Sequence, residues 1–145
     1  MSKCGTCTLC CKLTGIKEIG KAVGEWCKYC NINVGCNIYD TRPQSCKNFE
    51  CVWLRDGWGE ELRPDKCHLM FEQIPGSDAY IAIREPGFDE AWLEELPQRK
   101  MRQLADGGHP VVIRTSPKTI QVLTPEKMSA SQVWAELKTA FRKLL

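Results

Sequence analysis

Residues 4–11 read CGTCTLCC, and this stretch organises the N-terminal half of the 145-residue chain. Two residues separate Cys4 from Cys7 and Cys7 from Cys10, and Cys11 follows Cys10 directly. Such spacing lets a tight turn direct two sulfurs at one point, and Gly5 tolerates the positive φ that this turn needs. A single cysteine is usually a small buried hydrophobe, whereas four cysteines in eight residues indicate metal ligation.

All the other cysteines also lie in the first 67 residues: they are Cys27, Cys30, Cys36, Cys46, Cys51 and Cys67. Residues 68–145 contain none. The distribution predicts a cysteine-cluster module over residues 1–67 and a second part over 68–145, packed together as one compact unit. Adjacent cysteines seldom fit one ion, so we expect Cys10 and Cys11 to serve different sites, or one of them to lie outside the ligand set.

Disulfides, metal ligands and redox-active thiols are the three roles open to these cysteines. Residues 1–7 contain no apolar core segment and no small-residue cleavage site of a secretory signal. We therefore expect a cytoplasmic protein whose thiols stay reduced. In that setting clustered cysteines indicate metal binding or redox chemistry rather than disulfides.

Composition and charge are those of an ordinary globular protein, with 43% hydrophobic and 26% charged residues. Twenty Lys and Arg against eighteen Asp and Glu leave a net charge of +2, which is too small an excess for a general nucleic-acid binder. No apolar run approaches the length that spans a bilayer. We expect a metal ion as the partner, with a protein partner as a further candidate, and neither nucleic acid nor a membrane.

Four strands are predicted in the C-terminal half, as two hairpins. Alternating apolar residues indicate strands over 68–74 and 79–84, joined by a Pro-Gly-Ser-Asp turn. Residues 111–113 and 119–123 flank a Ser-Pro-Lys turn in the same way. Sequential hairpins favour an antiparallel sheet with the helices on one face.

Two helices complete this half. Apolar spacing predicts a helix over 89–105 that is kinked or divided by Pro97, and a last helix that Ser129 or Ser131 caps. In the N-terminal half only a short helix around residues 10–19 is expected. The predicted fold class is α+β: an irregular, metal-stabilised, cysteine-rich N-terminal half packed on a ββαββα-like two-layer C-terminal half.

The cysteine strings also carry a resemblance. CGTCTLCC at residues 4–11, a cysteine at 27, and CNIYDTRPQSCKNFEC at residues 36–51 resemble the signature of the YkgJ-like cysteine-cluster family, which is described as a zinc- or iron-chelating domain. The similarity covers about the first half of the chain. It implies metal chelation but no defined reaction.

The resemblance implies eight metal ligands, which are Cys4, Cys7, Cys10, Cys11, Cys27, Cys36, Cys46 and Cys51. Tyr39 and Arg42 belong to the same signature and are expected beside the metal, where a guanidinium offsets thiolate charge. Cys30 and Cys67 are additions to the signature and weaker candidates. His68, which follows Cys67, is a further weak candidate.

The metal stays open between zinc ions and iron, including a 4Fe–4S cluster. Eight thiolates suffice for two tetrahedral zinc sites, while the spacing of Cys4, Cys7 and Cys10 is also that of an iron–sulfur run. The chain contains no Gly-rich phosphate loop and no Gly-x-Ser-x-Gly motif, which favours a protein that is not an enzyme. The leading interpretation is a metal-binding protein. The alternatives are an iron–sulfur redox, sensor or enzyme-accessory protein and a metal-trafficking chaperone.

Overall fold

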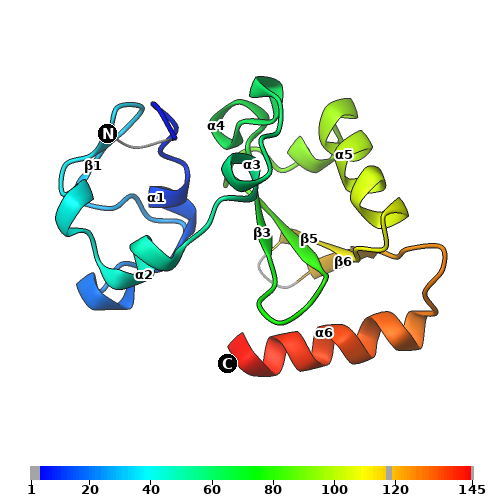
Figure 1. Cartoon of the computed structure of the whole chain (residues 1–145). Helices are drawn as coiled ribbons and strands as arrows, with labels where there is room; N and C mark the ends of the chain where they lie inside the picture. Colours follow the sequence, from blue (N-terminus) through cyan, green and yellow to red (C-terminus); the bar gives the residue numbers. More distant parts are fainter. Residues whose placement is uncertain (1–3, 117–118, 145) are drawn as a thin grey trace.

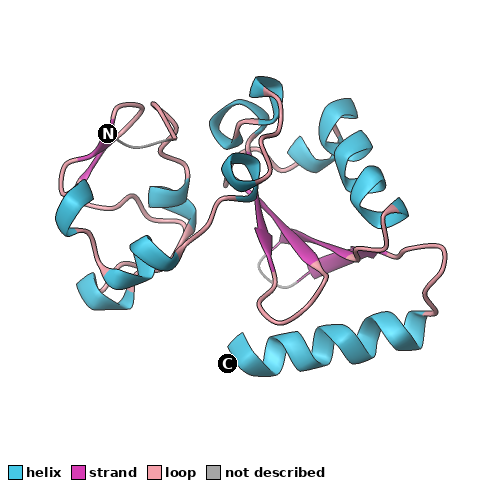
Figure 2. Cartoon of the chain, viewed as in Figure 1, coloured by secondary structure: helices cyan, strands magenta, loops and turns pink. Residues whose placement is uncertain are grey.

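The computed structural model describes residues 4–116 and 119–144. The N-terminal part is mostly loop with short helices and one two-stranded ladder (Figure 2). Its elements are α1 (Cys10–Leu13), the 3₁₀ turn η1 (Lys17–Ile19), β1 (Cys30–Asn31), β2 (Gly35–Cys36), η2 (Tyr39–Thr41) and α2 (Gln44–Asn48). The short helix expected around residues 10–19 therefore ends at Leu13, because Thr14 is extended and its hydroxyl donates to the Cys10 carbonyl at 2.6 Å.

The C-terminal part contains the larger sheet. Its elements are α3 (Val52–Arg55), η3 (Glu60–Leu62), α4 (Pro64–Cys67), β3 (Leu69–Gln73), β4 (Tyr80–Arg84), η4 (Ala91–Leu93), α5 (Glu95–Asp106), β5 (Val111–Ser116), β6 (Thr119–Leu123) and α6 (Ala130–Leu144). From β3 onward this is the expected order of strand, strand, helix, strand, strand, helix, so the α+β class is confirmed. The expected turn at 116–118 falls on residues 117–118, which lie outside the described residues.

Strand pairing gives a mixed sheet of order β3-β4-β5-β6. The two hairpin pairs β3–β4 and β5–β6 are antiparallel, as predicted. The central pair β4–β5 is parallel, with Tyr80 opposite Val111, so the expectation of a wholly antiparallel sheet is wrong. The reason is the crossover through η4 and α5, which returns the chain to the same end of the sheet before β5 begins.

The helices cover opposite faces of this sheet, and the expectation that both lie on one face is also wrong. On one face Phe71, Ala82 and Ile113 pack with Met101 of α5. On the other, Val112 packs with Val133 and with Leu137 of α6, as Figure 1 shows with α5 and α6 on either side of the strands. Neighbouring residues of a strand point to opposite faces, so both faces of an apolar strand need a cover.

Pro97 lies in the first turn of α5, where a missing N–H breaks no helical hydrogen bond. The predicted helix is thus divided before Pro97, into η4 and α5, rather than kinked at it. At the last helix, Ser129 accepts from the Gln132 backbone N–H at 3.2 Å, which is the predicted cap.

The N-terminal part packs on the face of the sheet that α6 also covers. Leu9 and Leu13, at the start and end of α1, are buried against Met70 of β3, and Ile83 of β4 joins the contact. Residues 52–67 belong with the opposite face, since Val52 and Cys67 pack into the α5 core. No helix within the described residues is long and apolar enough to cross a bilayer.

Candidate metal site

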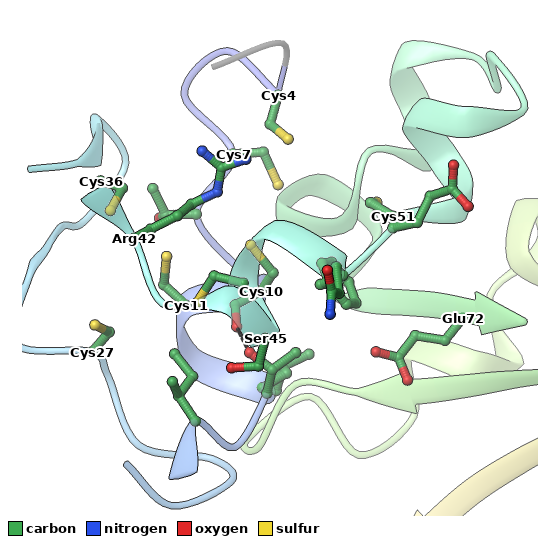
Figure 3. A pocket seen from close by; sticks show the side chains of 18 of the residues that line it. Cys4, Cys7, Cys10, Cys11, Cys27, Cys36, Arg42, Ser45, Cys51 and Glu72 are labelled. Atoms are coloured by element: carbon green, nitrogen blue, oxygen red, sulfur yellow. Dashed lines mark hydrogen bonds between the residues drawn. The ribbon is translucent and has the colours of Figure 1, made fainter. Parts of the chain in front are cut away.

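A cavity of about 1040 Å³ lies between the cysteine-rich loops and the sheet. Its wall contains eight cysteines, which are Cys4, Cys7, Cys10, Cys11, Cys27, Cys36, Cys46 and Cys51. Tyr39 and Arg42 also line it, whereas Cys30 and Cys67 do not. The structure thus brings together, around one space, all the cysteines that the resemblance selects. Figure 3 labels each of them except Cys46.

Short backbone contacts position the first cysteine string. The Cys7 N–H donates to the Cys4 carbonyl at 3.2 Å, and Gly5 within this turn has φ +61°, the conformation that glycine adopts at no steric cost. Cys10 and Cys11 follow in the first turn of α1. The string therefore presents its four thiols from one tight turn and the start of one short helix.

Hydrogen bonds from backbone N–H groups hold the segment around Cys27 and the turn between β1 and β2 against the first cysteine string. The Cys27 N–H donates to the Cys11 carbonyl at 3.0 Å, and the Thr8 hydroxyl accepts from the Asn33 N–H at 3.0 Å in the turn between β1 and β2. Cys36 ends β2, opposite Cys30 of β1. These contacts place loop cysteines from distant positions on one wall.

Glu18 holds the helix that carries Cys46. One Glu18 oxygen accepts from the Ser45 N–H at 3.0 Å and the other from the Ser45 hydroxyl at 2.7 Å, at the start of α2. The Ser45 hydroxyl lowers the pKa of Glu18 below its ordinary 4.5, because it binds the charged form. Sequence reasoning missed Glu18, since its partner lies 27 positions away and no motif joins the two.

Arg42 places a permanent cation among the thiols. Its Nη1 donates to the Tyr39 carbonyl at 2.7 Å, and its guanidinium stacks over the Tyr39 ring at 3.9 Å. Figure 3 shows the Arg42 side chain reaching into the cavity between Cys36 and Cys7. Tyr39 thus orients the Arg42 guanidinium at the cavity wall.

Four of the eight cavity thiols have a raised pKa, which favours their protonated form. Desolvation raises the pKa of Cys7 to about 11 and also raises the pKa of Cys46 and Cys51. The neighbouring Cys10 thiol, followed by burial, raises the pKa of Cys11. Metals bind thiolates, so an ion entering this cavity must displace protons.

The chemistry of the donor set fits zinc or iron. No imidazole lines the cavity, and the soft sulfur donors suit tetrahedral zinc or an iron–sulfur cluster. No disulfide joins any of the ten cysteines, all of which are described. Within the described part of the chain, no group of three or more His, Cys, Asp or Glu side chains is arranged to hold an ion as it stands. Metal binding therefore requires the thiols to turn toward one another, as is usual where metal binding and folding are coupled.

The two additional cysteines have other surroundings. The Cys67 Sγ donates to the Leu69 carbonyl at 3.4 Å and lies in the α5 core, which is the packing role typical of a buried cysteine. Cys30 interacts with the Cys11 thiol from outside the cavity wall. Neither is brought to the cavity with the other eight.

His68 is also away from this cavity, in a cluster at the junction of the two parts. Its Nδ1 lies 2.8 Å from Glu85 Oε2, and its ring stacks on Phe88 with centroids 3.5 Å apart. Lys12, directly after the first cysteine string, forms an ion pair with Glu85 Oε1 at 3.1 Å. The structure thus places His68 in a contact between α1 and the sheet.

Comparison of the chain with known protein families, curated proteins and solved structures finds no match in any of the three.

Proposed function

We propose that this chain is a metal-binding protein that holds zinc or iron through the thiolates of the eight cysteines around the cavity. The observation that carries the proposal is which cysteines line the cavity and which do not. Eight cysteines from three separate strings line one space, and the two cysteines outside the signature do not. The resemblance of these strings to a zinc- or iron-chelating family supports the same function.

The remaining features of the site agree with this function. Arg42 supplies positive charge where thiolates would accumulate. The cysteine-rich loops contain few helices or strands, and a bound metal would hold these loops together. We propose a cytoplasmic location, where such thiols stay reduced, and no catalytic role for the chain's own side chains.

Iron–sulfur binding is the rival within this proposal. Cys4, Cys7 and Cys10 have the spacing of an iron–sulfur run, and Cys51 lies near enough to Cys4 for their charges to interact. A 4Fe–4S cluster needs four cysteine ligands, and Cys51 would be the fourth beside these three. A redox or sensor role would follow from the cluster, and a trafficking role from zinc or iron held in an open cavity.

Anaerobic purification followed by metal analysis and a visible spectrum tests the proposal. We expect stoichiometric zinc or iron in the wild-type chain, and a loss of bound metal in Cys36→Ser, with Cys67→Ser as the matched control. Iron together with acid-labile sulfide selects the cluster over zinc. A metal-free wild-type chain that also fails to take up either metal on reconstitution would contradict the proposal.

A further inference from the structure

The ladder between β1 and β2 places two cysteines directly opposite each other. Cys30 of β1 pairs with Cys36 of β2, and Asn31 pairs with Gly35. Directly opposite residues of an antiparallel pair carry their side chains on the same face of the ladder. The Cys30 and Cys36 thiols therefore belong to one face, with only the width of the ladder between them.

The hydrogen bonds of the ladder define which kind of pair this is. The Asn37 N–H donates to the Tyr29 carbonyl at 2.9 Å, so the neighbouring pair is a hydrogen-bonded one. Hydrogen-bonded and non-hydrogen-bonded pairs alternate along an antiparallel ladder, which makes Cys30 and Cys36 a non-hydrogen-bonded pair. The Cα atoms of such a pair lie about 4.5 Å apart, within the range of roughly 4.4–6.8 Å that a disulfide spans.

The turn between the two strands holds this register. The Val34 N–H donates to the Asn31 carbonyl at 2.9 Å. Asn33, with φ +62°, donates its N–H to the Thr8 hydroxyl at 3.0 Å. Because Thr8 is only 2% exposed, the turn is anchored on a buried residue, and the two cysteines stay opposite each other in the folded chain.

The two members of the pair differ in their relation to the cavity. Cys36 lines the cavity wall (Figure 3), whereas Cys30 does not. Both residues are partly exposed, so a small molecule in solution can reach them. Cys30 is thus a thiol outside the proposed set of ligands that lies directly opposite one of them.

We propose that Cys30 and Cys36 form a reversible disulfide across this ladder when the chain meets a hydroperoxide. With hydrogen peroxide, the Cys36 thiolate attacks one oxygen, the O–O bond breaks, and Cys36 becomes a sulfenic acid while the released hydroxide takes up a proton. The Cys30 sulfur then attacks the Cys36 sulfur, so that the S–S bond forms, the S–O bond breaks, and hydroxide leaves with the Cys30 proton as water. The two sulfurs together lose two electrons, and the peroxide is reduced to two molecules of water.

The consequence for metal binding rests on the proposed function. Metals bind thiolates, so oxidation to the disulfide would remove Cys36 from the set of ligands and weaken the hold on the metal. A dithiol would restore both cysteines by thiol–disulfide exchange. In a reducing compartment such a transient disulfide is typical of redox sensing rather than of a structural bond.

Cys11 is the rival partner, since its thiol also interacts with that of Cys30. Within the described residues, however, no backbone hydrogen bond joins Cys11 to Cys30. The ladder fixes the backbones of Cys30 and Cys36 at the separation that a disulfide needs. The geometry therefore favours Cys36, and the position of the bond distinguishes the two partners.

Peroxide treatment of the anaerobically purified, metal-loaded chain tests the inference, followed by alkylation of free thiols under denaturing conditions and mass spectrometry of tryptic peptides. Both cysteines lie in the tryptic peptide of residues 29–47, whose third cysteine is Cys46, because trypsin does not cleave between Arg42 and Pro43. We expect one internal disulfide in this peptide, an alkyl group on Cys46, and alkylation of all three cysteines after reduction with a dithiol. A bond from Cys30 to Cys11 would link two peptides and would overturn the inference, as would full alkylation of this peptide at every dose of peroxide.

Cys30→Ser removes the thiol that would form the bond and keeps Cys36. This variant should bind metal before oxidation, but its Cys36 should pass from the sulfenic to the sulfinic acid, which a dithiol does not reduce. A chromogenic chelator should therefore show metal release by peroxide in both chains, and a dithiol should restore metal binding in the wild type and not in Cys30→Ser. Cys67→Ser, which changes the other cysteine outside the cavity wall, is the control and should recover like the wild type.

Equal recovery of metal binding in Cys30→Ser and the wild type would contradict the inference. Failure of the proposed function gives a different result. The wild type would then form the disulfide between Cys30 and Cys36 while holding no metal before oxidation.

Discussion

Glu18 shows how one exposed residue can position a cysteine that we propose as a metal ligand. It holds the start of α2 through both hydrogen bonds to Ser45, and the next residue of that helix is Cys46. The hydrogen bonds lower the pKa of Glu18, so the folded state gains from the charged form. This contribution is fully present above the ordinary Glu pKa of 4.5 and is lost as the pH falls through the lowered value.

Glu18→Gln should therefore lower the affinity for metal by about tenfold, as the loss of a residue that orients a ligand does. Competition with a chelator at neutral pH measures the change. Glu25→Gln changes an exposed acid of the same part of the chain that forms no hydrogen bond or ion pair with α2 among the described residues, and it should leave affinity unchanged. If the two variants behave alike, Glu18 does not position Cys46.

Substitution of Cys67 tests whether this cysteine lies outside the set of metal ligands. Because its thiol lies in the α5 core and bonds to the Leu69 carbonyl, Cys67→Ser should destabilise the fold by about 1 kcal/mol and leave the number of bound metal ions unchanged. Denaturant unfolding and metal analysis of the same sample give both values. Loss of one equivalent of metal would mean that the set of eight ligands is wrong.

Among the elements, α1 links the cysteines to the sheet. It begins with Cys10 and Cys11, ends with the buried Leu13, and between them carries Lys12, whose ammonium pairs with Glu85. Both partners are mostly buried, with side-chain exposures of 18% and 13%. The ion pair is thus better shielded from solvent than an ordinary surface pair.

Lys12→Met keeps the aliphatic length of the side chain and removes its charge. Glu85 then keeps only His68 as a partner, so we expect a loss of about 1–3 kcal/mol in the free energy of unfolding, typical of a half-buried charge that loses its partner. Lys17→Met, in the exposed η1 turn, serves as the control in the same denaturant series. Equal stability of the two variants would show that the pair contributes nothing.

Some helices and strands of this fold can be predicted from local sequence, and others cannot. The hairpins and α5 follow from local periodicity and turn residues, which act over a few positions. The parallel β4–β5 pair depends on where a crossover returns, and no local pattern records that. Glu72 of β3 lines the cavity, and local alternation does not record that either, because only the packing of α1 over Met70 shows that this face of the strand is covered.

At the scale of the whole molecule, two parts of the chain form the cavity wall, and they differ in how much buried apolar packing stabilises them. The sheet and its helices have two buried clusters of their own. Among the described residues of the part that carries the cysteine strings, the buried apolar side chains are Leu9, Leu13 and Ile16, and the first two pack against Met70. Since an area this small stabilises little, most of the order in residues 4–51 should come from bound metal.

Removal of metal by a chelator should therefore release residues 4–51 and leave the sheet folded. Hydrogen exchange followed by mass spectrometry measures this by segment, with fast exchange expected in peptides from residues 4–51 and retained protection in β3, β4 and β5. Residues 52–67 decide where the boundary lies. Although they include Cys67, Val52 packs into the α5 core, so they should remain protected with the sheet. Simultaneous loss of protection in both parts would mean that they form one cooperative unit whose stability depends throughout on the metal.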